Sequence, residues 1–207
     1  TGAEIDGNVA ITAGAVTLEA NAVGGVGITG AVTADGTDST LTVNSGTGVS
    51  GLVTLTNDAL LDINGAVNLY LVNNNPNTPL SIAATDTIDG SVTTDNGTTT
   101  NAGIINGVVT TNSGTMINTG EINGNIIVNE ALITAPASVM ANSGTITADS
   151  VTVLGGNLNA TGGAINSDSI VVSGGRLNAG GGTFANKAGT VGTALVAVSG
   201  AGTLDVN

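Results

Sequence analysis

The chain of 207 residues contains no cysteine, no histidine and no tryptophan. Without cysteine there is no disulfide framework, and thiols give no indication of the redox compartment. Without histidine and cysteine, the usual nucleophile–base pairs and nearly all transition-metal sites are excluded. Carboxylates are therefore the main chemical groups left for catalysis or metal binding.

Positive charge is almost absent. Arg176 and Lys187 face fifteen Asp and Glu residues, for a formal net charge of −13. Nucleic acids are bound largely through Lys and Arg, and anionic membranes attract basic segments, so neither partner is expected. The chain has no apolar run of about 18 residues that could insert into a membrane, and no signal peptide at its start. Two basic residues also leave trypsin-like proteases few cleavage sites, which suits exposure outside a cell.

Aromatic residues are limited to Tyr70 and Phe184, although 41% of the residues are apolar. The core must therefore be narrow and aliphatic. Since only 8% of the residues are charged, the surface must consist mainly of Thr, Ser, Asn, Gly and Ala.

A short phrase recurs along the chain: an apolar residue, a small polar residue, glycine, any residue and then a β-branched aliphatic residue. The copies lie at 5–9, 28–32, 63–67, 88–92, 105–109 and 122–126. The last three begin 17 residues apart, and blocks 88–104 and 105–121 are identical at nine positions. A second repeat of 19 residues relates 146–164 to 165–183, with eleven identities. Such periods are typical of solenoids, in which each coil buries its apolar side against its neighbours.

Short β-branched runs, such as 151–153 and 170–172, predict strands throughout and no helix. Gly and Asn between the runs predict corners, since both residues accept the left-handed backbone conformation. Asn-Ser-Gly-Thr occurs at 44–47, 112–115 and 142–145. The alternative is an antiparallel sandwich with Asn-Gly hairpins. A fixed repeat length favours the solenoid.

We therefore predict an all-β, single-domain parallel β-solenoid over residues 1–207. It should have about ten rungs of 17–25 residues and be about 50 Å long at ~4.8 Å per rung. A loop should leave the coil near 72–79, where two prolines cannot donate to a ladder, and a smaller one at 135–137. The equal spacing predicts a stacked core with these members: Ile88, Ile105, Ile122, Val92, Val109, Ile126, Leu158 and Leu177. Gly156 and Gly175, and Asn159 and Asn178, should also be equivalent, with a ladder of Asn side chains at matching corners.

No catalytic residue is predicted. The candidate calcium ligands are Asp35, Asp38, Asp86 and Asp89; Asp58 and Asp62 form a further close pair. We favour the simpler interpretation that these carboxylates are solvated turn residues. A polysaccharide-active site would need aromatic platforms and a basic residue near the acids, and the calcium nonapeptide pattern is absent. Thr93 and Thr110 hint at an ice-binding face, although Ile127 takes the next position in the repeat.

The Asn-x-Gly-x-Ile-x-Gly rhythm of 101–127 and the Ser-Gly-Gly-x-Leu-Asn phrase of 173–178, echoed at 199–206, resemble the passenger regions of bacterial autotransporters and related secreted adhesins. The resemblance is one of repeat style and covers most of the chain. It implies a right-handed parallel β-helix that is secreted to the bacterial cell surface and used for adhesion, self-association or as a stalk.

The expected function is thus non-enzymatic: a secreted or cell-surface structural protein without a cofactor, whose partners are further copies of itself, head to tail or laterally, or other cell surfaces. The alternatives are a polysaccharide-active enzyme and a calcium- or ice-binding module on the same fold. The chain is already in its repeat phrase at Ile5 and ends in a strand-like run at 202–207. We expect either a longer solenoid or open ends that pair into a filament.

Overall fold

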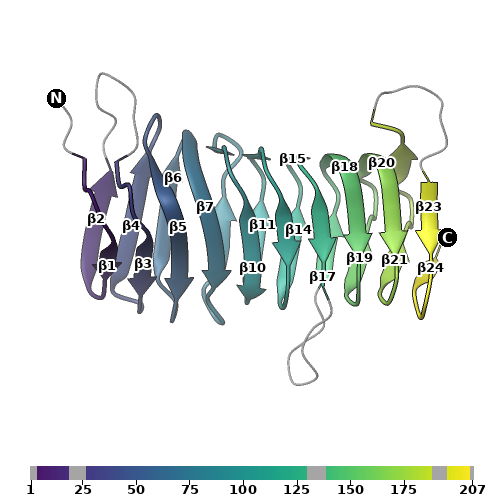
Figure 1. Ribbon diagram of the computed structural model, residues 1–207, viewed down its shortest axis with the longest axis horizontal. Helices are drawn as coiled ribbons and strands as arrows, with labels where there is room; N and C mark the ends of the chain where they lie inside the picture. The colour runs from purple at the N-terminus through teal and green to yellow at the C-terminus, as the bar shows by residue number, and fades with distance from the viewer. Residues whose placement is uncertain (1–3, 19–26, 130–138, 188–194, 206–207) are drawn as a thin grey trace.

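The computed structural model describes residues 4–18, 27–129, 139–187 and 195–205. Every strand pairing in these ranges is parallel, and no helix occurs in them (Figure 1). In chain order the strands are β1 (Val9–Ile11), β2 (Gly14–Leu18), β3 (Val32–Asp35), β4 (Ser39–Asn44), β5 (Gly48–Thr56), β6 (Leu60–Asn64), β7 (Ala66–Asn74), β8 (Leu80–Ile82), β9 (Thr87–Ile88), β10 (Val92–Asn96), β11 (Thr98–Asn101), β12 (Ile104–Ile105), β13 (Val109–Thr111), β14 (Thr115–Asn118), β15 (Glu121–Asn123), β16 (Ile126–Val128), β17 (Val139–Asn142), β18 (Thr145–Val153), β19 (Asn157–Asn159), β20 (Ala164–Val172), β21 (Arg176–Asn178), β22 (Thr183–Ala185), β23 (Leu195–Val198) and β24 (Thr203–Asp205). The predicted parallel β-solenoid is confirmed.

The strands stack as three faces along the long axis of the molecule (Figure 1). The first face runs β1-β3-β5-β7-β10-β13-β16-β18-β20-β23, and the second contains β9, β12, β15 and β22. The nine-residue strands β7, β18 and β20 bend around the corner between these two faces and join them into one 14-stranded sheet. The third face is a seven-stranded sheet, β24-β21-β19-β17-β14-β11-β8, next to the three-stranded sheet β2-β4-β6.

The coils form a solenoid of about eight turns, slightly fewer than the expected ten rungs. Three of the turns include residues outside the described ranges, at 19–26, 130–138 and 188–194, so they are described only in part. The smaller loop expected at 135–137 also lies outside the described residues.

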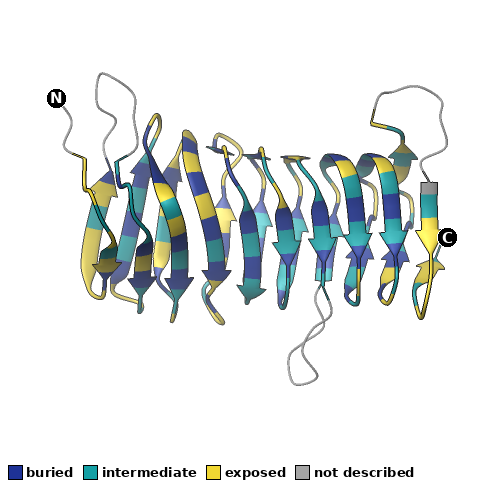
Figure 2. Cartoon of the chain, viewed as in Figure 1, coloured by how far each residue is buried: buried dark blue, intermediate teal, exposed yellow. Residues whose placement is uncertain are grey.

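The core consists of aliphatic columns inside the coil, because inward and outward residues alternate along each strand (Figure 2). Ile88, Ile105 and Ile122 pair in register on the second face. Val92, Val109 and Ile126 pair in register on the first face, and all six are fully buried, as the 17-residue spacing predicts. On the third face Leu158 pairs with Leu177, and both point inward.

The early copies of the repeat phrase are not all equivalent. Ile5, Ile28 and Val49 form one stack of bridges, and Val67 takes the corresponding position beside Ile88. Ile63, the first residue of its copy of the phrase, instead pairs with Val43 in the three-stranded sheet. The 35-residue interval between Ile28 and Ile63 therefore holds more than one turn, and the copy at 63–67 is displaced by four residues from the others.

In the copies of the phrase at 28–32, 88–92, 105–109 and 122–126, the glycine is required by stacking between rungs. A Cβ atom added to Gly90 would lie 1.8 Å from the backbone oxygen of Leu69, and one added to Gly107 would lie 2.2 Å from that of Gly90. Neither glycine has a positive φ, so the expectation of a left-handed conformation does not apply to them. It does apply to Gly46 and Gly114 of the Asn-Ser-Gly-Thr corners, whose φ angles are 78° and 85°.

The expected loop at 72–79 is shorter than predicted. Strand β7 continues to Asn74 and pairs with β5 and β10, so only residues 75–79 leave the ladder. Asn73 and Asn75 are buried, and the amide of Asn73 donates to the backbone oxygen of Thr98 at 3.0 Å. An Asn-rich segment therefore remains in the coil because its amides satisfy buried backbone groups.

Candidate functional site

The candidate calcium ligands at Asp35 and Asp38 lie at the turn between β3 and β4. The carboxylate of Asp35 accepts hydrogen bonds from the Thr56 hydroxyl at 2.9 Å and the Asn57 amide at 2.7 Å, which come from the next level of the coil. Asp38 is exposed. Asp35 thus links two successive turns of the solenoid.

Asp86 is buried and acts within a corner. Its carboxylate accepts from the backbone NH groups of Gly65 at 3.0 Å and Ala83 at 3.1 Å, and from the Thr85 hydroxyl at 3.2 Å. Asp89, which directly follows β9, is exposed, and its carboxylate accepts a hydrogen bond from the Asn106 amide at 2.8 Å. In the described ranges, no three acidic, histidine or cysteine side chains gather in a group that could hold a metal ion.

The pKa of the Asp58 carboxyl is lowered. The main cause is the hydrogen bond from the Asn77 side chain at 2.9 Å, supported by the backbone NH groups of Asn77 and Thr78. Asp58 and its neighbour Asn57 are also the only non-glycine residues with positive φ among those described. Asp58 therefore fixes the 75–79 loop against the preceding turn.

Both basic side chains form surface ion pairs. Arg176 pairs with Asp205 between the adjacent levels β21 and β24. Lys187 lies 2.5 Å from Asp149, and this hydrogen bond raises the pKa of Lys187. The negative charge of Asp168 also raises the pKa of Lys187, so this base lies near two carboxylates, whereas Arg176 pairs with Asp205.

The outward column that contains Thr93 and Thr110 is longer than the sequence indicates. Between Ala10 and Ala197, which pair with its two ends, it runs along the first face in parallel register with these eight members in order: Thr33, Thr54, Val72, Thr93, Thr110, Ile127, Thr152 and Val171. Ile127 does interrupt it, as expected, but threonine returns at Thr152. The result is a regular row of hydroxyl and methyl groups on the outer surface of a parallel sheet.

Three further ladders of polar side chains follow the coil. The buried ladder joins Asn101, Asn118 and Asn142 through amide-to-amide hydrogen bonds of 2.8 Å each. Two more accessible ladders have an aspartate at their first position; they are Asp89–Asn106–Asn123 and Asp95–Asn112–Asn129. The ladder expected at Asn159 and Asn178 is correct in register, but the Asn178 side chain instead accepts from the backbone NH of Gly180.

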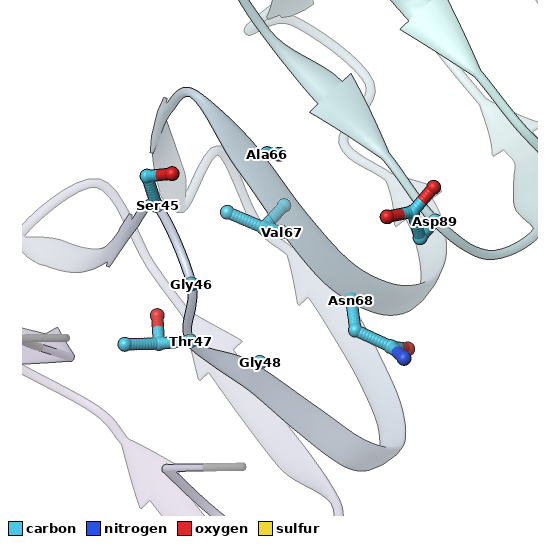
Figure 3. A pocket seen from close by; sticks show the side chains of 8 residues that line it. All are labelled: Ser45, Gly46, Thr47, Gly48, Ala66, Val67, Asn68 and Asp89. Carbon is cyan, nitrogen blue, oxygen red and sulfur yellow. The ribbon is translucent and has the colours of Figure 1, made fainter. Parts of the chain in front are cut away.

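A surface depression lies on the corner between the second and first faces. We name it the corner hollow: residues 45–48, 66–68 and Asp89, enclosing about 410 Å³. Figure 3 shows the Ser45–Gly48 loop on one side of the hollow and Asn68 and Asp89 on the other. Glycine at 46 and 48 and alanine at 66 leave the space, because their side chains are too small to fill it.

A second depression adjoins the first. We name it the bulge hollow: Val49, Ser50, Asn68 and Tyr70, about 260 Å³. The pairing of β5 with β7 shifts between Gly48 and Leu52, so that β5 has extra residues opposite Leu69 of β7. Such a bulge bends a strand and redirects its side chains. Asn68 lines both hollows, and the outward side chain of Tyr70 stands at the edge of the second.

Comparison with protein-family models, with curated proteins and with solved structures finds no significant match to this chain. In the residues that the structure describes, no helix is long and apolar enough to span a membrane. The function must therefore be argued from the geometry of the solenoid itself.

Sequence reasoning placed the stacked core but missed Asn68 and Tyr70 as neighbours of one depression. They are two residues apart in a strand whose side chains alternate between its two faces, and this spacing indicates that they share a face. The bulge that opens the space beside them depends on unequal rung lengths in β5 and β7, and no local motif marks it.

Proposed function

We propose that this chain is a non-enzymatic, secreted structural segment of a bacterial cell surface, which acts as a stalk or adhesin and self-associates through its flat faces. The observation that carries the proposal is the parallel register of aliphatic columns and side-chain ladders along the coil. A rod of this kind holds a fixed length because every turn is hydrogen-bonded to the next.

The surface chemistry supports the same proposal. The outward column of Thr, Val and Ile on the first face is uncharged, and the two bases are engaged in ion pairs. Neutral, regular faces can pack against one another. The net charge of −13 opposes lateral association at low ionic strength, and salt weakens that repulsion by screening.

Two measurements test the proposal. Immunogold labelling of intact source cells with antibodies against the purified chain should mark the outer surface; labelling only after permeabilisation would contradict the location. Light scattering and negative-stain microscopy of the chain at increasing salt should show rods that assemble laterally or end to end. A monomeric rod at every salt and protein concentration would refute self-association and leave a stalk.

A second candidate function, ice binding, is favoured by the threonine column on the first face. Five of its eight residues are Thr, and parallel strands repeat at a constant spacing of about 4.8 Å, which orders hydroxyl and methyl groups in a line. Replacing Thr93 and Thr110 by Lys should abolish any inhibition of ice recrystallisation. The absence of inhibition in the unaltered chain would reject this candidate.

A further inference from the structure

The two adjoining hollows on the β5–β7 corner place hydrogen-bonding groups beside an aromatic ring. Asn68 lines both of them, Asp89 borders the corner hollow, and Tyr70 borders the bulge hollow. Tyr70 is the only tyrosine of the chain, and 49% of its surface is exposed. An aromatic side chain this exposed contributes little to the core, so its position calls for another explanation.

A second apolar side chain accompanies the ring. Leu52 pairs with Tyr70 in register across β5 and β7, and 47% of its surface is exposed. Together they form a small apolar platform on a surface that is otherwise polar. Exposed apolar groups beside a depression are a common feature of ligand sites.

The polar groups of the hollows suit a polyhydroxylated ligand. The Asn68 amide offers a donor and an acceptor side by side, and the Asp89 carboxylate keeps acceptor capacity beyond its bond to Asn106. Ser45 and Ser50 are exposed and add hydroxyl groups that can donate or accept. Within the described residues, the Asn68 side chain has no hydrogen-bond partner in the protein, so a ligand would displace only water.

We propose that the corner and bulge hollows form a binding site for a neutral saccharide. One sugar ring stacks its C–H face on Tyr70, while vicinal hydroxyls of the same or the next unit bond to Asn68 and Asp89. The combined volume of the hollows, about 410 and 260 Å³, falls in the range for small-ligand pockets. Asp89 is the one carboxylate among the lining residues, which contain no base, so acidic sugars are repelled.

The absence of tryptophan makes Tyr70 a natural reporter, because it dominates the intrinsic fluorescence of the chain. Titration with cellobiose, maltose and diacetylchitobiose should give a saturable change in tyrosine fluorescence with at least one of the three. Glucuronic acid should give a weaker response. No saturable change with any neutral probe, or tighter binding of glucuronic acid, would overturn the proposal.

Variants locate the site. In saturation-transfer NMR with the responding sugar, Tyr70→Ala should abolish the signal, Tyr70→Phe should retain it, and Asn68→Ala should weaken binding about tenfold, the effect of losing roughly 1.4 kcal/mol of hydrogen bonding. Leu154→Ala is the matched control, since Leu154 is a similarly exposed apolar residue outside both hollows. Equal binding by Tyr70→Ala and the unaltered chain would place the sugar elsewhere and refute the site.

This inference is independent of the structural role proposed above. Rod assembly is measured by scattering and saccharide binding by fluorescence and NMR. A chain that assembles but binds no sugar refutes only the site, and one that binds sugar as a permanent monomer refutes only self-association.

Discussion

The side-chain amide of Asn101 donates to the Oδ1 atom of Asn118 at 2.8 Å, 17 residues further along the chain and one turn up the coil. Asn118 in turn donates to Asn142 at 2.8 Å, and all three residues are fully buried. Asn118 thus supplies both a donor and an acceptor, and the ladder fixes the register of the third face. The Oδ1 atom of Asn101, at the start of the ladder, is buried without a hydrogen-bond partner, which is costly.

Replacing Asn118 by Ala should remove both bonds and leave Asn101 and Asn142 with unpaired groups. We expect a loss of about 3 kcal/mol in the free energy of unfolding, measured by urea titration. Asn123→Ala is the control, because Asn123 belongs to an exposed ladder and water can replace its partner. Its cost should stay within about 0.5 kcal/mol. Equal losses in the two variants would mean that the buried ladder adds nothing beyond solvent-exposed pairing.

The two residues of β12 offer a matched test of the core. Ile105 is fully buried between Ile88 and Ile122, whereas its neighbour Ile104 faces outward and is only partly buried. Ile105→Ala should lower the free energy of unfolding by about 3 kcal/mol, and Ile104→Ala by less than about 1 kcal/mol. Thermal melting of both variants checks this. A larger effect at Ile104 would reverse the assigned inward and outward faces.

Regular spacing is what made the core predictable. Where blocks repeat after 17 or 19 residues, equal positions return to one face, and the pairing of Leu158 with Leu177 follows directly. The copy at 63–67 does not follow the equal spacing, and its Ile63 belongs to a different sheet. Irregular rungs can satisfy the same local pattern in more than one register, and the packing of neighbouring turns decides between them.

The candidate carboxylates show the limit of sequence reasoning for sites. Asp86 and Asp89 are close in sequence, yet one is buried under backbone NH groups of a corner and the other lies at the start of an exposed ladder. The hollow beside Asp89 arises from a register shift in β5 and from small residues in the preceding loop. Both depend on contacts between turns, which a single repeat does not encode.

The phrase glycines should tolerate no side chain. In Gly90→Ala the added Cβ would lie 1.8 Å from the Leu69 oxygen, so the two turns must separate. We expect a loss of about 3 kcal/mol, at the upper end for overpacking. Gly162→Ala is the comparison, because its Cβ would meet nothing within 4 Å and only its φ of 90° is unfavourable. That variant should lose about 1 kcal/mol. If both melt alike, backbone conformation and not rung contact explains the glycines.

Asp58 should make stability depend on pH in the acidic range. In the folded chain its pKa lies below the usual value of an aspartate, chiefly because the Asn77 side chain donates to the carboxylate. A depressed pKa means that the ionised form stabilises the fold: the contribution is complete above the unfolded pKa and is lost as the pH falls through the folded one. The melting temperature of the chain should therefore decrease on acidification below about pH 4 more steeply than that of Asp58→Asn.

At neutral pH the Asp58→Asn variant should melt at a lower temperature than the unaltered chain, because an amide accepts fewer hydrogen bonds than a carboxylate. Asp38→Asn, at an exposed turn position, serves as the control and should follow the unaltered chain at both pH values. Parallel acid profiles for Asp58→Asn and the unaltered chain would show that the contacts of Asp58 with the 75–79 loop do not stabilise the solenoid.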